Sequence, residues 1–498
     1  MNQEDQMKHH STVSHKERMK ATGLEKKDAE DSKSGYRDLD EVMASPEAVW
    51  KRPWWVKAVE KPTTEVDWQG TARFDVNKVQ QINWRNYVGE EEEKRLMKLA
   101  KERTREWLLE KKSGYTLRDR ALSAGSQSGT VPVTFFGTYA SLPKMSEVKH
   151  PEKGSKGPRV MAPGSTKPLN FEEMGAPRYE GSPEENARLV RAAARLYGAS
   201  QVGFVELNEN HRKLIYARDG LDGKLIEFEN VDEAYETEKK RVIPEKARWV
   251  IIFSVQMSEE TLKVRDGDLS TAVSSATHGH AYGRGRNIMD SLQTFLYVLG
   301  YQGLSSDWYN GLGIGPALGA VAGLGEIGRT NQLISPEYGL HQRLFRLVTD
   351  LPLAVTKPID AGILDFCRVC KSCAEKCPSG SLSMETEPTW TPAGPWNNPG
   401  HKSWFENGPT CMSLWRESTV GCSTCYAVCP YGKKDMSFIH TIVKATIARN
   451  PLFRDVVNNL MVRMDELFGY QEPRDGNAWW DLNLPPLGQS DVKGSDLE

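Results

Sequence analysis

The sequence has no long apolar run. Of its 498 residues, 38% are hydrophobic and 27% are charged. No stretch approaches the roughly 18 consecutive apolar residues of a membrane-spanning helix. The formal net charge is only −2, so charge alone indicates neither a nucleic acid nor an anionic membrane as a partner. These absences leave a globular chain that is long enough for two or three packed units.

An export signal is also missing. Residues 14–20 read Ser-His-Lys-Glu-Arg-Met-Lys and stand where a twin-arginine signal would be, but the paired arginines are absent. The residues that follow, 25–34, are charged, so they provide no hydrophobic signal core. The sequence therefore predicts a disordered polar N-terminus over residues 1–38, a degenerate form of such a signal, and a cytoplasmic location for the chain as written.

Cysteine is absent from most of the chain. All eight cysteines lie in one short segment, whereas a disulfide framework would spread them across the fold. They are Cys367, Cys370, Cys373, Cys377, Cys411, Cys422, Cys425 and Cys429. This clustering indicates a metal site.

The cysteine spacing is that of bacterial ferredoxins. The first four follow the pattern C-x2-C-x2-C-x3-C-P, and the last three repeat its second half. In two-cluster ferredoxins the fourth cysteine of each run binds the other cluster. The spacing predicts that one [4Fe–4S] cluster binds Cys367, Cys370, Cys373 and Cys429. The other cluster is then predicted to bind Cys377, Cys411, Cys422 and Cys425. A zinc ribbon is the alternative, and the complete ferredoxin run disfavours it.

Helices and buried strands alternate ahead of this segment. Ser182, Pro183 and Glu185 predict a helix start with a capping box. Apolar residues at helical spacing predict a buried face on that helix made of Leu189, Ala193 and Leu196.

Strands are predicted at 201–207 and 249–255, and a further helix at 287–299. A charged amphipathic helix is expected at 90–111. The alternation predicts an α/β (α+β) sandwich.

The expected domain order is an N-terminal wrapping unit over 39–180, then an α/β domain over 181–350 with a polar insertion at about 208–247. A cluster domain over 351–440 and a C-terminal wrapping segment over 441–498 complete the chain.

A glycine-rich stretch runs from Gly311 to Gly328. Its second half matches the G-x-G-x-x-G pattern of dinucleotide-binding folds. No clean strand precedes it, which disfavours a nucleotide site. Glycines also let the backbone approach a large flat cofactor closely.

Several motifs together resemble the corrinoid-dependent reductive dehalogenases, at the level of the catalytic subunit. They are Gly323-Leu-Gly325-Glu326, Ser335-Pro-Glu-Tyr-Gly339, Thr349-Asp-Leu-Pro-Leu353 and Lys357-Pro-Ile-Asp360, followed by Phe366-Cys367. The resemblance implies a nitroreductase-like α/β domain that holds a base-off cobamide, joined to a ferredoxin-like domain with two [4Fe–4S] clusters. Members usually have a Ser-Arg-Arg-x-Phe-x-Lys export signal, from which this sequence departs.

The resemblance also implies site residues. A tyrosine that donates a proton, a basic residue beside it and an asparagine fall by position on Tyr282, Arg343 and Asn310. A phenol with a pKa of about 10 needs a neighbouring cation to act near neutral pH, and arginine stays charged there. Competing candidates are Tyr297, Tyr301 and Tyr309 for the tyrosine and Arg329 for the cation. The expected corrinoid contacts are Gly311, Gly313, Gly323, Gly325, Ser335 and His278.

The sequence thus predicts an enzyme that replaces halogen by hydrogen on a small organohalide. An external low-potential electron donor is expected. The resemblance also implies a membrane-anchor subunit as a partner and is compatible with a homodimer. No nucleic acid is expected as a partner. Two alternatives stay open: a reductase similar to epoxyqueuosine reductase, and a noncatalytic two-cluster electron-transfer subunit. The sequence selects neither the organohalide nor the mode of cobalt chemistry.

Overall fold

The computed structural model describes ten parts of the chain. They are residues 52–120, 122, 134–142, 144, 167–306, 311–432, 444–446, 454–467, 469–482 and 484–488. The prediction of disorder over residues 1–38 lies outside them. No helix among these residues is both long and apolar enough to cross a membrane.

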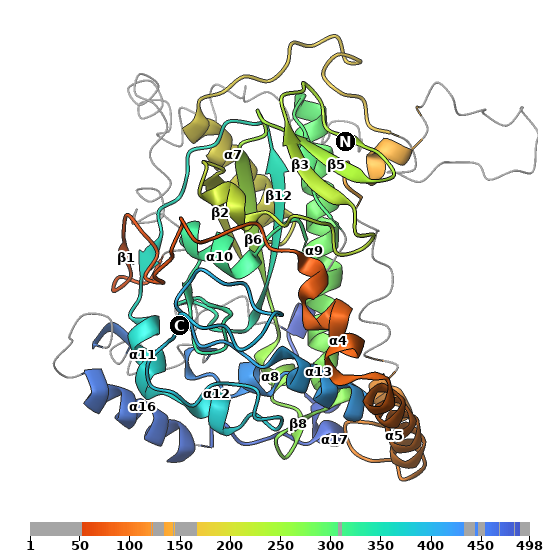
Figure 1. Cartoon of the computed structure of the whole chain (residues 1–498), viewed down its shortest axis with the longest axis vertical. Coiled ribbons are helices and arrows are strands. Elements are labelled where there is room, and N and C mark those ends of the chain that lie inside the picture. Colours follow the sequence, from red (N-terminus) through yellow and green to blue (C-terminus); the bar gives the residue numbers. More distant parts are fainter. Residues whose placement is uncertain are drawn as a thin grey trace, which may run out of the picture.

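A four-stranded antiparallel sheet forms the centre of the α/β part (Figure 1). Its order is β2 (Gln201–Glu206), β6 (Trp249–Gln256), β12 (Gln342–Thr349) and β9 (Gly303–Leu304). The predicted strands at 201–207 and 249–255 are confirmed as β2 and β6. Both are buried along most of their length because the sheet is covered on both faces.

Helix α7 (Pro183–Leu196) begins as the sequence predicts. The Ser182 side chain accepts a hydrogen bond from the backbone N–H of Glu185 at 3.2 Å. The predicted buried face is wrong, however, because Leu196 is 84% exposed. Small residues allow close packing, and the buried face is made instead of Asn186, Ala187, Val190 and Ala194.

Helix α9 (Ala272–Leu299) begins well before the predicted start at 287, so that boundary is wrong. Thr271 and Ser274 form its capping box. The turns of α9 that precede residue 287 contain several glycines, which are poor helix formers. Gly285 has a packing reason, since a Cβ atom there would lie 2.1 Å from the Phe345 ring on β12. Tyr282 therefore lies inside a helix and not ahead of one.

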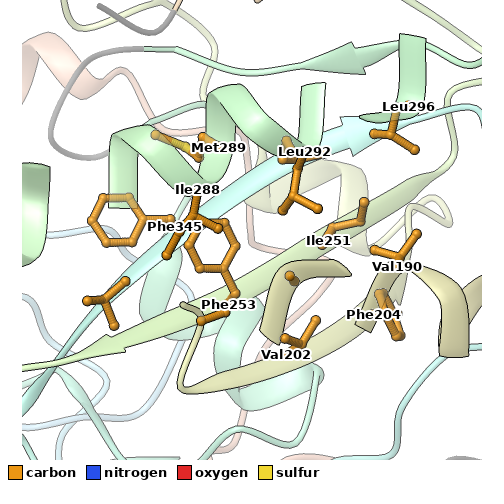
Figure 2. Close-up of a cluster of buried hydrophobic side chains, with 14 of the residues drawn as sticks. Val190, Val202, Phe204, Ile251, Phe253, Ile288, Met289, Leu292, Leu296 and Phe345 are labelled. Carbon is orange, nitrogen blue, oxygen red and sulfur yellow. The ribbon is translucent and has the colours of Figure 1, made fainter. Parts of the chain in front are cut away.

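Two apolar cores flank the sheet. In the first, Ile288, Leu292 and Leu296 of α9 pack over the sheet, where Phe253 and Phe345 stack with ring centroids 5.5 Å apart (Figure 2). The second core lies on the opposite face, under α10 (Gly315–Val321). Alternate residues of β12 point into the two cores, as the period of a strand requires.

The polar insertion at 208–247 forms a small sheet of its own. The order is β3 (Leu225–Glu229), β5 (Lys240–Pro244) and β4 (Tyr235–Glu236), after the short helix η5 (His211–Leu214). The N-terminal part contains β1 (Lys57–Ala58), η2 (Val76–Lys78), α4 (Gln80–Val88), α5 (Glu90–Leu109) and η3 (Thr138–Ser141). Helix α5 confirms the amphipathic helix predicted at 90–111.

The elements around the cysteines are short. They are α11 (Ile363–Val369), α12 (Ser372–Glu375), α13 (Gly408–Glu417), α14 (Thr424–Ala427) and η6 (Pro430–Gly432). The other short elements are α8 (Glu259–Leu262), β7 (Arg265–Asp266), β8 (Leu269–Ser270), β10 (Glu326–Ile327), β11 (Leu333–Ile334) and β13 (Ile359–Asp360). The last elements are α16 (Arg454–Leu467), α17 (Gly476–Trp479) and η7 (Pro486–Gly488). Distant segments meet here: β1 pairs with β13, and α13 packs on α4 and α5 (Figure 1).

Candidate iron–sulfur and catalytic sites

The structure gathers the cysteines into two groups of four. All eight are free thiols. Burial raises the pKa of the Cys373 thiol well above its usual value, and Cys370, Cys367 and Cys429 raise it further. These four thiols are therefore within electrostatic reach of one another. They are the residues of the first predicted cluster.

The second group forms around Cys425. Burial raises the pKa of this thiol, and Cys422, Cys373, Cys411 and Cys377 raise it further. Burial also raises the pKa of the Cys411 thiol, which is within electrostatic reach of Cys422 and Cys377. Cys373 belongs to the first group, so the two groups adjoin.

The donor set is eight thiols, the number that two [4Fe–4S] cubes require. Among the described residues, no three His, Cys, Asp or Glu side chains converge on a site for one metal ion. A zinc site would need its thiolates at about 2.3 Å from one ion. A Cβ atom on Gly328 would lie 3.2 Å from the Sγ atom of Cys367, so glycine keeps space beside that thiol. The donor set therefore fits the [4Fe–4S] clusters that the spacing predicts.

Arg329 holds the first cysteine loop. It is 1% exposed, and its Nε atom donates to the carbonyl oxygens of Cys367 at 3.1 Å and Cys370 at 3.2 Å. Its Nη1 atom donates to those of Ser383 at 2.7 Å and Glu385 at 2.6 Å. Arg329 was the alternative candidate for the catalytic cation, and the structure commits its guanidinium to this loop instead.

Arg343 lies between two tyrosines. Its Nη1 atom donates to the hydroxyl of Tyr426 at 2.7 Å. Its Cζ atom lies 4.8 Å from the ring centroid of Tyr426 and 5.3 Å from that of Tyr282. Its Nη2 atom donates to Nδ1 of His278. The guanidinium of Arg343 on β12 therefore contacts residues from two other elements. They are α9 and the cysteine-bearing α14.

Burial and charge set the protonation of this group. Burial lowers the pKa of His278 well below its usual value, and Arg343 lowers it further, so the imidazole is neutral. Burial opposes the charge of Arg343, but Tyr426 and Tyr282 raise its pKa on balance. Burial raises the pKa of Tyr426 to about 12 despite the adjacent Arg343. The site thus combines a fixed cation, two phenols and a neutral imidazole.

Several buried polar atoms here have no hydrogen-bond partner within the described structure. They are Nε2 of His278, Oε1 of Gln342, Nε of Arg343, and Nε and Nη2 of Arg346. Such atoms are uncommon, since each costs roughly 1–3 kcal/mol when left unpaired. A bound polar group would satisfy them. A cobamide, whose corrin ring bears amide side chains, fits this donor and acceptor set.

Two predicted cofactor glycines have a packing role. A Cβ atom on Gly323 would lie 2.0 Å from the carbonyl oxygen of Lys357. One on Gly325 would lie 2.3 Å from that of Ile334. These contacts by themselves require glycine, and corrinoid contact by the two residues stays a prediction.

Of the remaining predicted contacts, His278 lies in α9, Gly313 pairs with Ile215, Gly311 lies in a turn and Ser335 closes one with Gly339. A Cβ atom on Gly313 would lie 2.6 Å from a backbone carbonyl oxygen, and Gly311 lies against the guanidinium of Arg346. The Ser335 hydroxyl accepts from the backbone N–H of Tyr338 at 2.9 Å, within a turn. Asn310 lies outside the described residues.

Sequence reasoning missed Tyr426. It stands between Cys425 and Ala427, inside a run that was interpreted only through its cysteines. Its pairing with Arg343 joins residues 83 positions apart, and no local pattern indicates it. The one feature of the sequence that could have indicated Tyr426 is its position next to a predicted cluster cysteine.

Comparisons with known proteins match both parts of the chain. A family model described as reductive dehalogenase subunit matches residues 51–353, and a 4Fe-4S double cluster binding domain matches residues 366–432. The chain is 29% identical to the chloroethene reductive dehalogenase of Dehalococcoides mccartyi strain VS, over 97% of this chain and 99% of that one. It is 32% identical to the tetrachloroethene reductive dehalogenase of Sulfurospirillum multivorans, over 61% of each chain. An epoxyqueuosine reductase of Lactococcus garvieae is 31% identical over only 25% of this chain.

Solved structures show the same fold. The catabolic reductive dehalogenase NpRdhA aligns with a TM-score of 0.57 and 20% identity, over 89% of this chain and 52% of that one. A further structure, associated with B12-dependent dehalogenation, aligns with a TM-score of 0.53 over 88% of this chain and 55% of that one. The chain spans about half the length of these solved proteins. With a family model matched across more than half of its residues, this chain belongs to the reductive dehalogenase family.

Proposed function

We propose that this chain reduces a small organohalide, with Tyr282 as the proton donor and Arg343 as the cation beside it. In the overall reaction the carbon–halogen bond takes up two electrons and one proton, which gives a carbon–hydrogen bond and a halide ion. A cobamide supplies a reduced cobalt centre for this chemistry when it is bound. Relatives are named for chloroethene, trichloroethene and tetrachloroethene, so chlorinated alkenes are the first substrate class to test.

The position of Arg343 is the main support for this proposal. Its guanidinium lies near both phenols, and its own Nε atom and Nε2 of the adjacent His278 have no partner among the described residues. Tyr426 is the weaker candidate for the acid, because its hydroxyl already accepts a bond from Arg343 and burial raises its pKa to about 12. Tyr282 is partly buried, as Tyr426 is, and its ring faces the same cation. Arg343 would stabilise a phenolate left on Tyr282 after proton transfer.

Electrons are proposed to enter through the second cysteine group. Its members are all partly exposed, whereas the first group includes three buried thiols. A groove of about 750 Å³ runs beside α13, the helix that contains Cys411. Its lining includes Lys101, Arg105 and Arg416 and no acidic residue. An acidic redox protein matches this charge and is the proposed electron donor.

The cellular location of the chain and its association with a membrane-anchor subunit or a second copy are also proposals. Fractionation of cells that express this chain alone tests the location. A full-length, uncleaved product in the cytoplasm is the expected result. Processed protein outside the inner membrane would contradict it.

Anaerobic reconstitution of the full chain tests the proposed function. We expect about eight irons and one cobamide per chain, with release of chloride from trichloroethene when a low-potential donor is supplied. Tetrachloroethene and a brominated phenol test the substrate class in parallel. A chain that binds both cofactors and dehalogenates none of these compounds would refute the proposed activity.

A further inference from the structure

Four arginines are buried in the described structure, namely Arg241, Arg265, Arg329 and Arg346. The first three have carboxylates or several backbone carbonyls as partners, although the Nε atom of Arg265 has no partner among the described residues. Arg241 pairs with three carboxylates at 2.8 to 3.0 Å. Arg265 lies 3.6 Å from a carboxylate and donates to backbone carbonyls, and Arg329 donates to several carbonyls. Buried cations in proteins are usually paired or hydrogen-bonded in this way.

Arg346 is the exception. It is 4% exposed, and its Nη1 atom donates at 3.3 Å to the carbonyl of Leu344 on its own strand. Its Nε and Nη2 atoms have no partner among the described residues. Burial lowers its pKa, and the phenols of Tyr216 and Tyr282 counteract this. No carboxylate of the described residues pairs with this buried charge.

The guanidinium lies in a cradle of glycine backbone. A Cβ atom on Gly311 would lie 3.0 Å from Nη2, and one on Gly315 would lie 2.7 Å from Nη1. On this side of β12, the described β9 pairs only with Val348 and Thr349, so no described strand pairs with the backbone of Arg346 there.

We propose that Arg346 binds the phosphodiester of the cobamide nucleotide tail. A phosphodiester stays ionised, and its oxygens match the planar fork of a guanidinium. Halide, the other anion of the reaction, is released after each turnover. It would therefore not neutralise the charge of Arg346 between turnovers. A resident cofactor neutralises it throughout. This inference rests on the proposed function only in that the cofactor is a cobamide.

Corrinoid binding tests the site without any measure of activity. The full chain, with its clusters reconstituted and no corrinoid bound, is titrated with cobalamin and with cobinamide, which lacks the phosphodiester and the base. We expect the wild-type chain to prefer cobalamin by about tenfold or more. Arg346→Met should lose most of that preference and Arg346→Lys should keep part of it. Leu344→Met, on the same face of β12, is the matched control and should keep all of it.

Thermal unfolding provides a second measurement. Without corrinoid, Arg346→Met should be as stable as the wild type or more stable, because it removes an uncompensated charge. With cobalamin, the wild type should gain more stability than the variant. A variant that is destabilised without corrinoid and keeps the cobalamin preference would show a structural arginine and overturn the inference.

Two further outcomes separate the hypotheses. If Arg346→Met keeps the cobalamin preference but loses inhibition by added chloride or iodide, the site binds halide and the inference is wrong. Equal binding of both corrinoids by the wild type would also overturn it, while the proposed function stands. A chain that binds neither corrinoid would refute both.

Discussion

Arg343 donates a hydrogen bond to the hydroxyl of Tyr426 at 2.7 Å, while its Cζ atom lies 5.3 Å from the ring of Tyr282. One arginine is therefore shared between a residue of the cysteine segment and the proposed proton donor. The two tyrosines have different surroundings, so they are expected to respond differently to loss of the hydroxyl.

Tyr282→Phe removes the proposed acid and keeps the ring. General acid catalysis is typically worth about 10²–10⁴-fold, so turnover should fall by at least the lower figure. Arg343→Lys should reduce turnover less than Arg343→Ala, because a charge remains although the planar fork is lost. Single-turnover dehalogenation measures the effect, with iron and cobamide content as the control. Full cofactor content with near wild-type turnover in Tyr282→Phe would show that another tyrosine is the acid.

Tyr426→Phe removes the hydroxyl that accepts from Arg343 and leaves the cysteines in place. A hydrogen bond to a charged group is worth about 1.5–3 kcal/mol, so kcat should fall by roughly tenfold to a hundredfold through a misplaced Arg343. Iron content should not change. If kcat is unaffected and KM rises instead, the hydroxyl contributes to substrate binding and not to the position of Arg343.

Arg329→Lys should prevent the protein from binding the first predicted [4Fe–4S] cluster. A lysine ammonium cannot make the divergent bonds by which the guanidinium holds the carbonyls of Cys367, Ser383 and Glu385. Iron should fall from about eight toward about four per chain after reconstitution. Arg368→Lys is the matched control, because Arg368 lies on α11 beside Cys367 but is half-buried and paired with Asp365, and it should keep all its iron. Equal iron in both variants would rule out this role for Arg329.

The sequence predicts what depends on short spacings. The cap at Ser182 and the strands at 201–207 and 249–255 all follow from neighbours a few residues apart, whereas the assignment of the cysteines to the two clusters stays a prediction. The start of α9 was missed because its glycines disfavour a helix locally, and the contact between Gly285 and Phe345 that requires glycine is long-range. The buried face of α7 was wrong because fit against the sheet favours Ala187, Val190 and Ala194 over the larger Leu196. The roles of Tyr426 and Arg346 could not be predicted from the sequence for the same reason, since the contacts of both residues form only in the folded chain.

Glu326 should make stability depend on pH. Its side chain is buried beneath α11, where Oε2 accepts from the backbone N–H groups of Ala361 at 2.8 Å and Ile363 at 3.0 Å. The hydroxyl of Thr63 donates to Oε1 at 2.6 Å. Burial raises its pKa from 4.5 to about 7, although these bonds oppose the shift. The folded chain therefore binds more protons at this group than the unfolded chain between these two values.

Stability from Glu326 should consequently be full below about pH 4.5 and should decline as pH rises toward 7, by about 3 kcal/mol in all. Glu326→Gln keeps an acceptor for both N–H groups and cannot ionise, so it should flatten this part of the profile. Urea unfolding of the reconstituted protein between pH 5 and 8 measures the slope, with the exposed Glu184→Gln as control. Parallel profiles for wild type and Glu326→Gln would mean that the carboxyl stays ionised in the fold, held so by its three hydrogen bonds.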